Sequence, residues 1–151
     1  MTRNRSQIGK KNRKDGRNFE GWLIKRLAAF FNLEHFNNKN FFTSNIGSTG
    51  VFSKILDGQK QDIWFKDDVF KDLAFQCKKT LTHGKDKKNI DIQPLLDMNQ
   101  DKIRILVTKV TMRPNKNEKE IGKFVTMSYE DFEKYFLNLW KESNFTESTK
   151  E

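Results

Sequence analysis

Three polar side chains in the middle of the chain combine the groups that a metal-assisted hydrolysis needs. They are Asp62, which opens Asp-Ile-Trp-Phe, and Gln76 and Lys78, which belong to Phe-Gln-Cys-Lys. Side chains alternate between the two faces of a strand, so Gln76 and Lys78 share one face and Phe75 and Cys77 share the other. Pairing the two segments as strands through the charged turn between them places Asp62 on the face of Gln76. A carboxylate, an amide oxygen and an ammonium can together hold a divalent cation and place a water.

A second carboxylate lies where the helical pattern predicts apolar packing. Residues 15–32 have the period of an amphipathic helix, and at 100° per residue Glu20 falls between Leu27 and Phe31, inside the apolar stripe. A carboxylate that faces the core is costly unless it is paired, protonated or bound to a metal. The alternative is a glutamate near the first turn that bends out to water and favours the helix dipole.

These residues predict a site for a hard cation such as Mg²⁺, which prefers oxygen ligands. The expected ligands are Glu20, Asp62, the side-chain oxygen of Gln76 and the backbone carbonyl of Cys77. The metal would lower the pKa of a bound water, and Lys78 would orient or deprotonate that water and stabilise charge in the transition state. The Cys77 thiol lies on the apolar face, so we expect it to be buried rather than nucleophilic.

The elements that must position this site alternate along the chain. We expect helices over 15–32 and 91–98 and from Ser128 onward, where Ser-Tyr-Glu-Asp is a capping-box pattern, and strands near 41–46, 61–65, 73–79, 103–110 and 122–127. This order predicts an α/β fold with a mixed sheet. We expect one domain over residues 15–141, a flexible basic arm over 1–14 and a frayed tail over 142–151.

The charge pattern points to a polyanionic partner. The formal net charge is +9, and residues 1–17 hold seven basic side chains and one acidic one. The candidate phosphate contacts are Arg3, Arg5, Lys10, Lys11, Arg13, Lys14 and Arg17, then Ser53, Lys54 and Lys60, and then Lys79, Lys85, Lys87 and Lys88. Such contacts give affinity and salt dependence but little sequence readout. The basic N-terminus alone also fits a solvated tail or a localisation signal, and the glycine-bearing loop 47–60 also fits a plain turn.

Composition limits the class of protein further. The sequence contains no apolar run of membrane-spanning length and no signal-peptide pattern, so we expect no membrane partner. Its single cysteine fits a reducing compartment. We expect a cytoplasmic location, which would be the host cytoplasm for a phage protein.

With its motifs in this order, the chain resembles the PD-(D/E)XK nuclease superfamily. Glu20 lies in an amphipathic first helix, Asp62-Ile-Trp-Phe follows, and then comes Phe75-Gln76-Cys77-Lys78. Within the superfamily the chain is similar to the small Holliday junction resolvases of archaea and phages, which share the basic N-terminus and a closing strand that runs into a helix, here residues 123–132. The similarity of order covers about residues 10–140.

The resemblance implies a restriction-endonuclease-like core, a central mixed sheet of about five strands flanked by helices. It also implies dependence on Mg²⁺ or Mn²⁺ and cleavage of four-way junctions or other branched DNA by a homodimer. Glu20, Asp62 and Lys78 match the family's acid, acid and lysine. Gln76 departs from the pattern, because the family usually has an acidic residue there, and the lost charge should weaken cation binding. Gln61 stands where the family usually has proline.

Other functions remain open at this point. One is a restriction-like or repair nuclease that acts on ordinary duplex DNA. Another is a non-catalytic DNA-binding protein that keeps the nuclease fold, since loss of the acid at Gln76 could abolish cleavage. An RNA-binding protein fits less well, because the interleaved aromatic residues of a base-stacking platform are missing.

Overall fold

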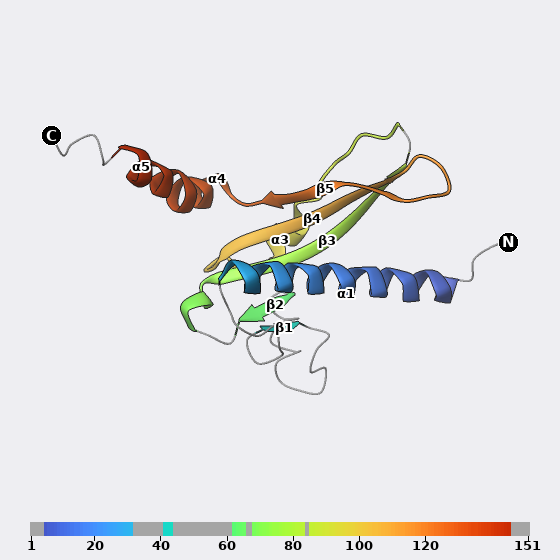
Figure 1. Cartoon of the computed structure of the whole chain (residues 1–151), viewed down its shortest axis with the longest axis horizontal. Coiled ribbons are helices and arrows are strands. Elements are labelled where there is room, and N and C mark those ends of the chain that lie inside the picture. The colour runs from blue at the N-terminus through green and yellow to red at the C-terminus, as the bar shows by residue number, and fades with distance from the viewer. Residues whose placement is uncertain (1–4, 32–40, 44–61, 66–67, 84, 146–151) are drawn as a thin grey trace.

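A mixed β-sheet forms the centre of the fold, with helix α1 on one face and the short helix α3 on the other (Figure 1). The computed structural model describes residues 5–31, 41–43, 62–65, 68–83 and 85–145. Arg3, Ser53, Lys54, Lys60 and residues 44–46 of the first expected strand lie outside the described residues.

The strands follow one another across the sheet in chain order. They are β1 (Phe41–Thr43), β2 (Ile63–Phe65), β3 (Leu73–His83), β4 (Ile103–Arg113) and β5 (Lys119–Thr126). The pair β3 and β4 is parallel, and the other neighbours are antiparallel. The predicted α/β fold with a mixed sheet flanked by helices is confirmed, and the elements follow in the predicted order.

The helices lie before, between and after the long strands. They are α1 (Arg5–Phe30), α3 (Gln93–Asp97), α4 (Tyr129–Asp131) and α5 (Asn138–Phe145), with a π-helical segment at Phe132–Leu137 between the last two. A 3₁₀ turn at Asp68–Phe70 connects β2 to β3. The crossover between the parallel strands β3 and β4 contains α3, as parallel pairing requires a long connection.

Alternation along β3 gives the protein two apolar clusters. Phe75 and Cys77 face α1 and pack with Ile63, Leu23 and Ile24. The next cluster, on the face of α3, contains Ala74 and Leu106 of the sheet with Leu95 and Met98. The predicted assignment of Phe75 and Cys77 to one apolar face is confirmed.

Several predicted boundaries are wrong, including those of the strands expected at 103–110 and 122–127, since β4 extends to Arg113 and β5 begins at Lys119. Helix α1 begins at Arg5, so residues 5–14 of the expected flexible arm are helical, because Lys, Arg and Gln are good helix formers and extend a helix that packing has nucleated. Strand β3 runs to His83 rather than ending near Lys79, because β4 continues beside it to Arg113. At the other end α5 reaches Phe145, so residues 142–145 of the expected tail are helical.

The C-terminal helical region begins as its sequence predicts. The Ser128 hydroxyl oxygen accepts a hydrogen bond of 3.2 Å from the Asp131 backbone N–H, which caps α4. Figure 1 shows α4 and α5 projecting away from the sheet. Aromatic side chains therefore stay exposed there, among them Phe136 at 51% and Trp140 at 57%.

Candidate active site

A hydrogen bond between a side chain and the backbone fixes Asp62 at the edge of β3. The Cys77 backbone N–H donates to Asp62 Oδ2 over 2.7 Å, and the Asp62 backbone N–H donates to the Phe75 carbonyl over 2.9 Å. Ile63 pairs with Phe75, so Asp62 lies opposite Gln76 in the register. The predicted pairing of these two segments is therefore present, and it holds the Asp62 carboxylate beside the Gln-Cys-Lys stretch.

Glu20 reaches the same place from the opposite layer. Its neighbours Phe19, Leu23 and Ile24 are buried against the sheet, so the face of α1 that carries Glu20 is turned toward β3. Glu20 itself is half-buried and lines a pocket together with Asp62 and Lys78. Packing, rather than sequence proximity, brings the two carboxylates to one pocket, and Lys78 borders both this pocket and a second hollow on the α3 side.

This pocket has a volume of about 490 Å³ and lies between α1, β3 and the end of the β4–β5 hairpin. Its complete lining is Lys11, Asn12, Asp15, Gly16, Glu20, Asp62, Cys77, Lys78, Lys79, Leu81, Arg113 and Glu118. The pocket thus combines four acidic side chains, two of them paired with Lys79 and Arg113, with four basic ones. That combination suits a ligand with anionic oxygens held next to a bound cation.

Gln76 does not line this pocket. Its side chain is 8% exposed, and its Oε1 atom is buried without a hydrogen-bond partner. It shares the α3 face of the sheet with its register partner Leu106. The register places Asp62 opposite Gln76. The pocket lining nevertheless gives no support to the prediction that the Gln76 amide joins the carboxylates there. A buried, unpaired amide oxygen is costly and calls for an explanation.

The Cys77 thiol is buried, as expected, and is poorly suited to act as a nucleophile. Burial raises the pKa of the Cys77 thiol far above its ordinary value, and the negative charges of Asp62 and Glu20 raise it further while Lys78 opposes them. A thiolate, not a thiol, is the reactive form.

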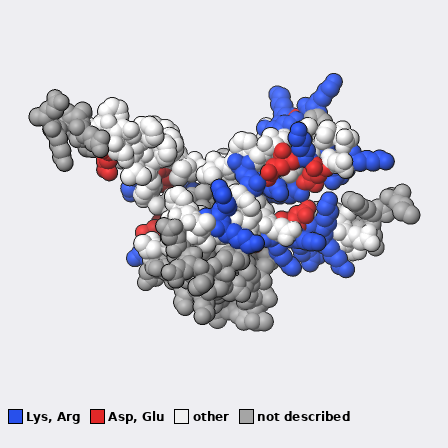
Figure 2. Space-filling view, viewed as in Figure 1, with Lys and Arg blue, Asp and Glu red and all other residues white. Residues whose placement is uncertain are grey.

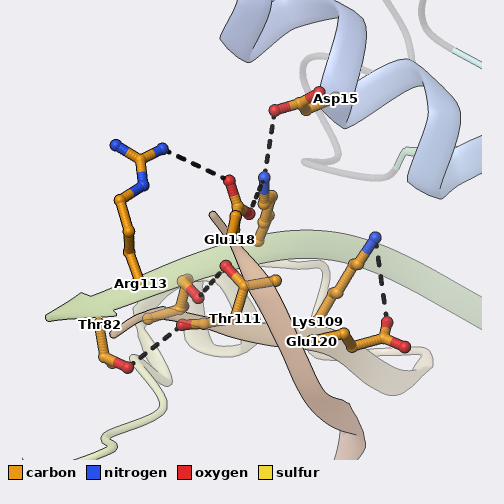
Figure 3. A network of polar contacts seen from close by, with 9 residues as sticks. Asp15, Thr82, Lys109, Thr111, Arg113, Glu118 and Glu120 are labelled. Atoms are coloured by element: carbon orange, nitrogen blue, oxygen red, sulfur yellow. Dashed lines mark hydrogen bonds and ion pairs between the residues drawn. The ribbon is translucent and has the colours of Figure 1, made fainter. Parts of the chain in front are cut away.

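Lys79, one of the expected DNA contacts, is engaged within the protein. Its ammonium lies 3.1 Å from Asp15 Oδ2 and 2.5 Å from Glu118 Oε1, and Arg113 Nη2 lies 3.7 Å from Glu118 Oε2 (Figure 3). Partial burial alone would lower the pKa of Lys79, but its hydrogen bonds to Glu118 and Asp15 outweigh this effect and raise it. These pairs tie α1, β3 and the β4–β5 hairpin together around the pocket.

The remaining expected DNA contacts whose side chains the structure describes lie on the surface, and Arg5, at the start of α1, is not among the side chains described. Arg5, Lys10, Lys11, Arg13, Lys14 and Arg17 belong to α1, and Lys85, Lys87 and Lys88 follow β3 in an exposed segment. Figure 2 shows Lys and Arg gathered in two groups, one over the N-terminal half of α1 and one over the far end of the β-strands, with acidic residues between them. This face is suited to a polyanion.

A metal-binding cluster and a membrane-spanning helix are both absent from the residues that the structure describes. Over these ranges no cluster of three or more His, Cys, Asp or Glu side chains is placed to hold a metal ion. None of the helices in this part of the chain has the length and apolar character needed to cross a membrane.

Sequence reasoning missed the three charged pocket residues Asp15, Arg113 and Glu118, as well as Asn12, Gly16 and Leu81. Arg113 and Glu118 frame the turn between β4 and β5, and both fall in a stretch whose only visible property is charge. Asp15 meets Lys79 across 64 positions of sequence. No local pattern signals such pairs.

Comparison of the chain with models of protein families, with characterised proteins and with solved structures found no match.

Proposed function

We propose that the protein is a metal-dependent DNA endonuclease that hydrolyses phosphodiester bonds in branched DNA, with four-way junctions as its preferred substrate. The observation that carries the proposal is the meeting of Glu20, Asp62 and Lys78 at one pocket. These are the three residues for which the resemblance to PD-(D/E)XK nucleases implies a catalytic role, and they come from α1, the start of β2 and the middle of β3. The finer fold assignment, a restriction-endonuclease-like core, is part of the same proposal.

The residues around the pocket fit a hard divalent cation in part. Glu20 and Asp62 supply carboxylate oxygens, which Mg²⁺ and Mn²⁺ prefer. The N–H and C=O of one strand residue point to the same edge, so the Cys77 carbonyl lies on the edge where its N–H meets Asp62. Gln76 would have to turn its unpaired Oε1 toward this edge to contribute.

A bound Mg²⁺ would polarise the phosphoryl group and lower the pKa of a water. The chain's own residues would do the rest. Cys77, through its N–H, holds Asp62 in one orientation and directs the carboxylate toward the pocket. Lys78 lines the pocket, but alternation along β3 puts its side chain on the α3 face with Gln76, where it also borders a second hollow beside Gln93 and Asp97. Its exposed ammonium would have to turn to the edge of β3 to orient the attacking water and stabilise negative charge on the phosphate oxygens.

DNA as the partner is supported by the charge pattern around the pocket. The chain has a formal net charge of +9. The basic residues of α1 lie on the side where the pocket opens between α1 and the hairpin. Contacts of this type recognise the backbone and its shape rather than base sequence. A DNA partner and the buried thiol of Cys77 are consistent with a cytoplasmic location for the enzyme.

The test compares a synthetic four-way junction with a linear duplex of matching sequence, in Mg²⁺, in Mn²⁺ and in EDTA. We expect paired, symmetric nicks on the junction alone, and we expect EDTA to abolish them. Equal cutting of both substrates would contradict junction selectivity and support a general duplex nuclease. No cutting by the wild-type protein in either metal would overturn the endonuclease.

A second candidate function is supported by Gln76. The amide replaces an acidic residue of the resembled family, and its side chain is buried away from the pocket lining. A non-catalytic DNA-binding protein that retains the nuclease fold would show these features. It predicts junction binding without cleavage in both metals.

We also propose that the protein acts as a homodimer through its C-terminal face, defined here as the exposed side of β5 and the helical region over residues 129–145. Val125 at 64%, Tyr129 at 64% and Leu139 at 61% exposure belong to it, with Phe136 and Trp140. An aromatic side chain can bury ~150–250 Å². Three aromatic and two aliphatic side chains, each roughly half exposed, therefore offer on the order of 500 Å² of surface to a partner. With the outer edge of β5 this approaches the roughly 800 Å² that each partner contributes to a standard interface.

A further inference from the structure

Glu118 places a negative charge among the cations of the pocket. Its two carboxylate oxygens contact different partners, Lys79 at 2.5 Å and Arg113 at 3.7 Å (Figure 3). The hydrogen bond with Lys79 lowers the pKa of Glu118 despite partial burial, and Thr111 and the charge of Lys11 lower it further. Glu118 is therefore ionised, and three cations from α1, β3 and β4 act on it.

These cations border a groove that continues away from Glu20. Lys11, Asn12, Leu81 and Arg113 line both the pocket with Glu20 and an adjoining hollow of about 410 Å³, which extends to Gln7 and Ile8. Helix α1 rises 1.5 Å per residue, so Glu20 and Ile8 are about 18 Å apart along the helix axis. One DNA strand carries a phosphate every ~3.4 Å of duplex axis and more widely along the backbone itself, so the groove has room for more than one phosphate.

Arg113 has donor capacity that Glu118 does not use. Its Nε atom is buried and has no hydrogen-bond partner, and the contact from Nη2 to Glu118 is longer than a hydrogen bond. A guanidinium binds a phosphate best through two parallel N–H donors. A backbone phosphodiester carries its charge on two non-bridging oxygens and can accept two parallel N–H donors from this arginine, which Glu118 does not do because its Oε1 is held by Lys79.

We propose that Lys11, Lys79 and Arg113, here called the cation set, form a subsite for a DNA backbone phosphate next to the scissile one, and that Glu118 occupies this subsite until DNA displaces it. The subsite rests on the proposed endonuclease, because the phosphate it binds belongs to the strand that reaches Glu20 and Asp62. Lys79 keeps its pair with Asp15 when Glu118 leaves, so the subsite stays positioned on α1.

Binding of a fluorescent junction and a fluorescent duplex in EDTA tests the subsite without any cleavage. Glu118→Gln removes the charge that competes with the phosphate. One phosphate contact changes the slope of log K against log[salt] by about 0.9, so we expect the variant to bind about five- to tenfold more tightly at 0.1 M salt. Glu120→Gln is the matched control, because Glu120 lies on the same hairpin, pairs with Lys109 and Lys123, and does not line the pocket. Equal effects of the two variants would overturn the proposal.

Arg113→Gln gives an independent test that leaves the contacts of Lys79 in place. We expect it to lower the salt slope of binding by about 1, as loss of one phosphate contact does. In the double variant with Glu118→Gln, the gain in affinity should fall below twofold, because the guanidinium that the phosphate would use is missing. A full five- to tenfold gain in the double variant would overturn the subsite. Melting temperatures of all variants show whether each is folded.

The outcomes separate the subsite from the proposed endonuclease. Tighter binding by Glu118→Gln with no cleavage by the wild-type protein would overturn the endonuclease and support the subsite. Cleavage by the wild-type protein with no selective effect of Glu118→Gln would overturn the subsite alone. No detectable DNA binding by either protein would overturn both.

Discussion

The Cys77 backbone N–H and the Asp62 carboxylate are joined by a hydrogen bond of 2.7 Å that spans 15 positions of sequence. The bond orders the carboxylate at the point where β2 begins, while the Cys77 side chain is buried under α1. One residue therefore serves both the core and the pocket. A charged acceptor on a backbone N–H is among the stronger hydrogen bonds in proteins, so the orientation of Asp62 is well determined.

The first prediction concerns the two carboxylates. Asp62→Asn and Glu20→Gln should each lower single-turnover cleavage of the junction at least about 100-fold, because each removes a negative oxygen from the proposed metal site. In Asp62→Asn the amide oxygen of the new side chain can still accept from the Cys77 N–H, so the fold is preserved. Junction binding in EDTA should change less than twofold. Asp101→Asn, at an exposed turn, is the control and should cleave normally. Normal cleavage by Asp62→Asn would exclude this site.

The second prediction concerns Gln76. A carboxylate introduced by Gln76→Glu lies in a buried position, so the variant should melt at a lower temperature than wild type in EDTA. Once residue 76 turns from the α3 face toward Asp62, Mg²⁺ should restore part of the loss and should raise the melting temperature of the variant more than that of wild type, because the new oxygen then adds a negative ligand. A variant whose melting temperature does not respond to Mg²⁺ or Mn²⁺ would show that residue 76 does not face the cation.

Features encoded within a few residues of sequence could be predicted. The Ser128 cap, the alternation of Phe75 and Cys77 and the half-buried position of Glu20 all follow from local periodicity or a capping pattern. Each depends on neighbours along the same element. The order of elements and the α/β class follow from the same signals.

Features set by distant partners could not be predicted. The polar stretch over residues 80–83 looks like a loop, and it is strand because β4 runs beside it and the Thr82 hydroxyl donates to the Thr111 carbonyl. Lys79 looks like a surface cation, but Asp15 and Glu118 reach it from other elements. The pocket-lining role of Arg113 depends on the β4–β5 hairpin, whose end borders the pocket opposite α1, and no period in the sequence encodes that placement.

The third prediction concerns the core on the α3 face. Leu106 has no exposed surface and packs with Ala74, Leu95 and Met98. Leu106→Ala should lower the free energy of unfolding by about 2–5 kcal/mol, the range for a buried leucine that leaves a cavity. Leu96→Ala on the neighbouring helix is the control, because Leu96 is 49% exposed, and it should cost less than about 0.5 kcal/mol. Urea unfolding measures both, and equal losses would mean that α3 does not cover Leu106.

The fourth prediction is a pH dependence of stability from Glu118. The pKa of Glu118 is lowered in the folded protein, mainly by Lys79, so its contribution to stability is present above the unfolded pKa of about 4.3 and is lost as pH falls through the lower folded value. The free energy of unfolding of wild type should exceed that of Glu118→Gln at pH 6 by about 0.5–1 kcal/mol. The difference should shrink steadily below about pH 4.

Lys79 sets the upper limit of this window. Its pKa is raised in the folded protein, so the stability it contributes is present below its unfolded pKa of about 10.4 and is lost as pH rises through the folded value. The difference between wild type and Glu118→Gln should therefore be nearly constant from about pH 6 to about pH 9. A difference that grows as pH falls below about 4 would contradict the ion pair.

The fifth prediction tests the proposed homodimer. The C-terminal face carries a stack of Phe132, Phe136 and Trp140, whose ring centroids lie 5.1 and 6.4 Å apart, and Leu139 beside it is 61% exposed. A lysine at position 139 would place an ammonium in the proposed interface, where it would lose its hydration without gaining a partner. Sedimentation equilibrium should give twice the chain mass of 17.9 kDa for wild type and the single mass for Leu139→Lys.

Leu96→Lys is the matched control for this experiment, since Leu96 is exposed to a similar degree but lies on α3, away from the C-terminal face. It should leave the dimer intact. A monomeric wild-type protein at micromolar concentration, or a dimer that survives Leu139→Lys, would contradict the proposed interface. The position also separates assembly from chemistry, because Leu139 lies outside the pocket lining. A folded Leu139→Lys monomer that nicks one strand of a junction without the paired second nick would show that the dimer serves to couple two cuts.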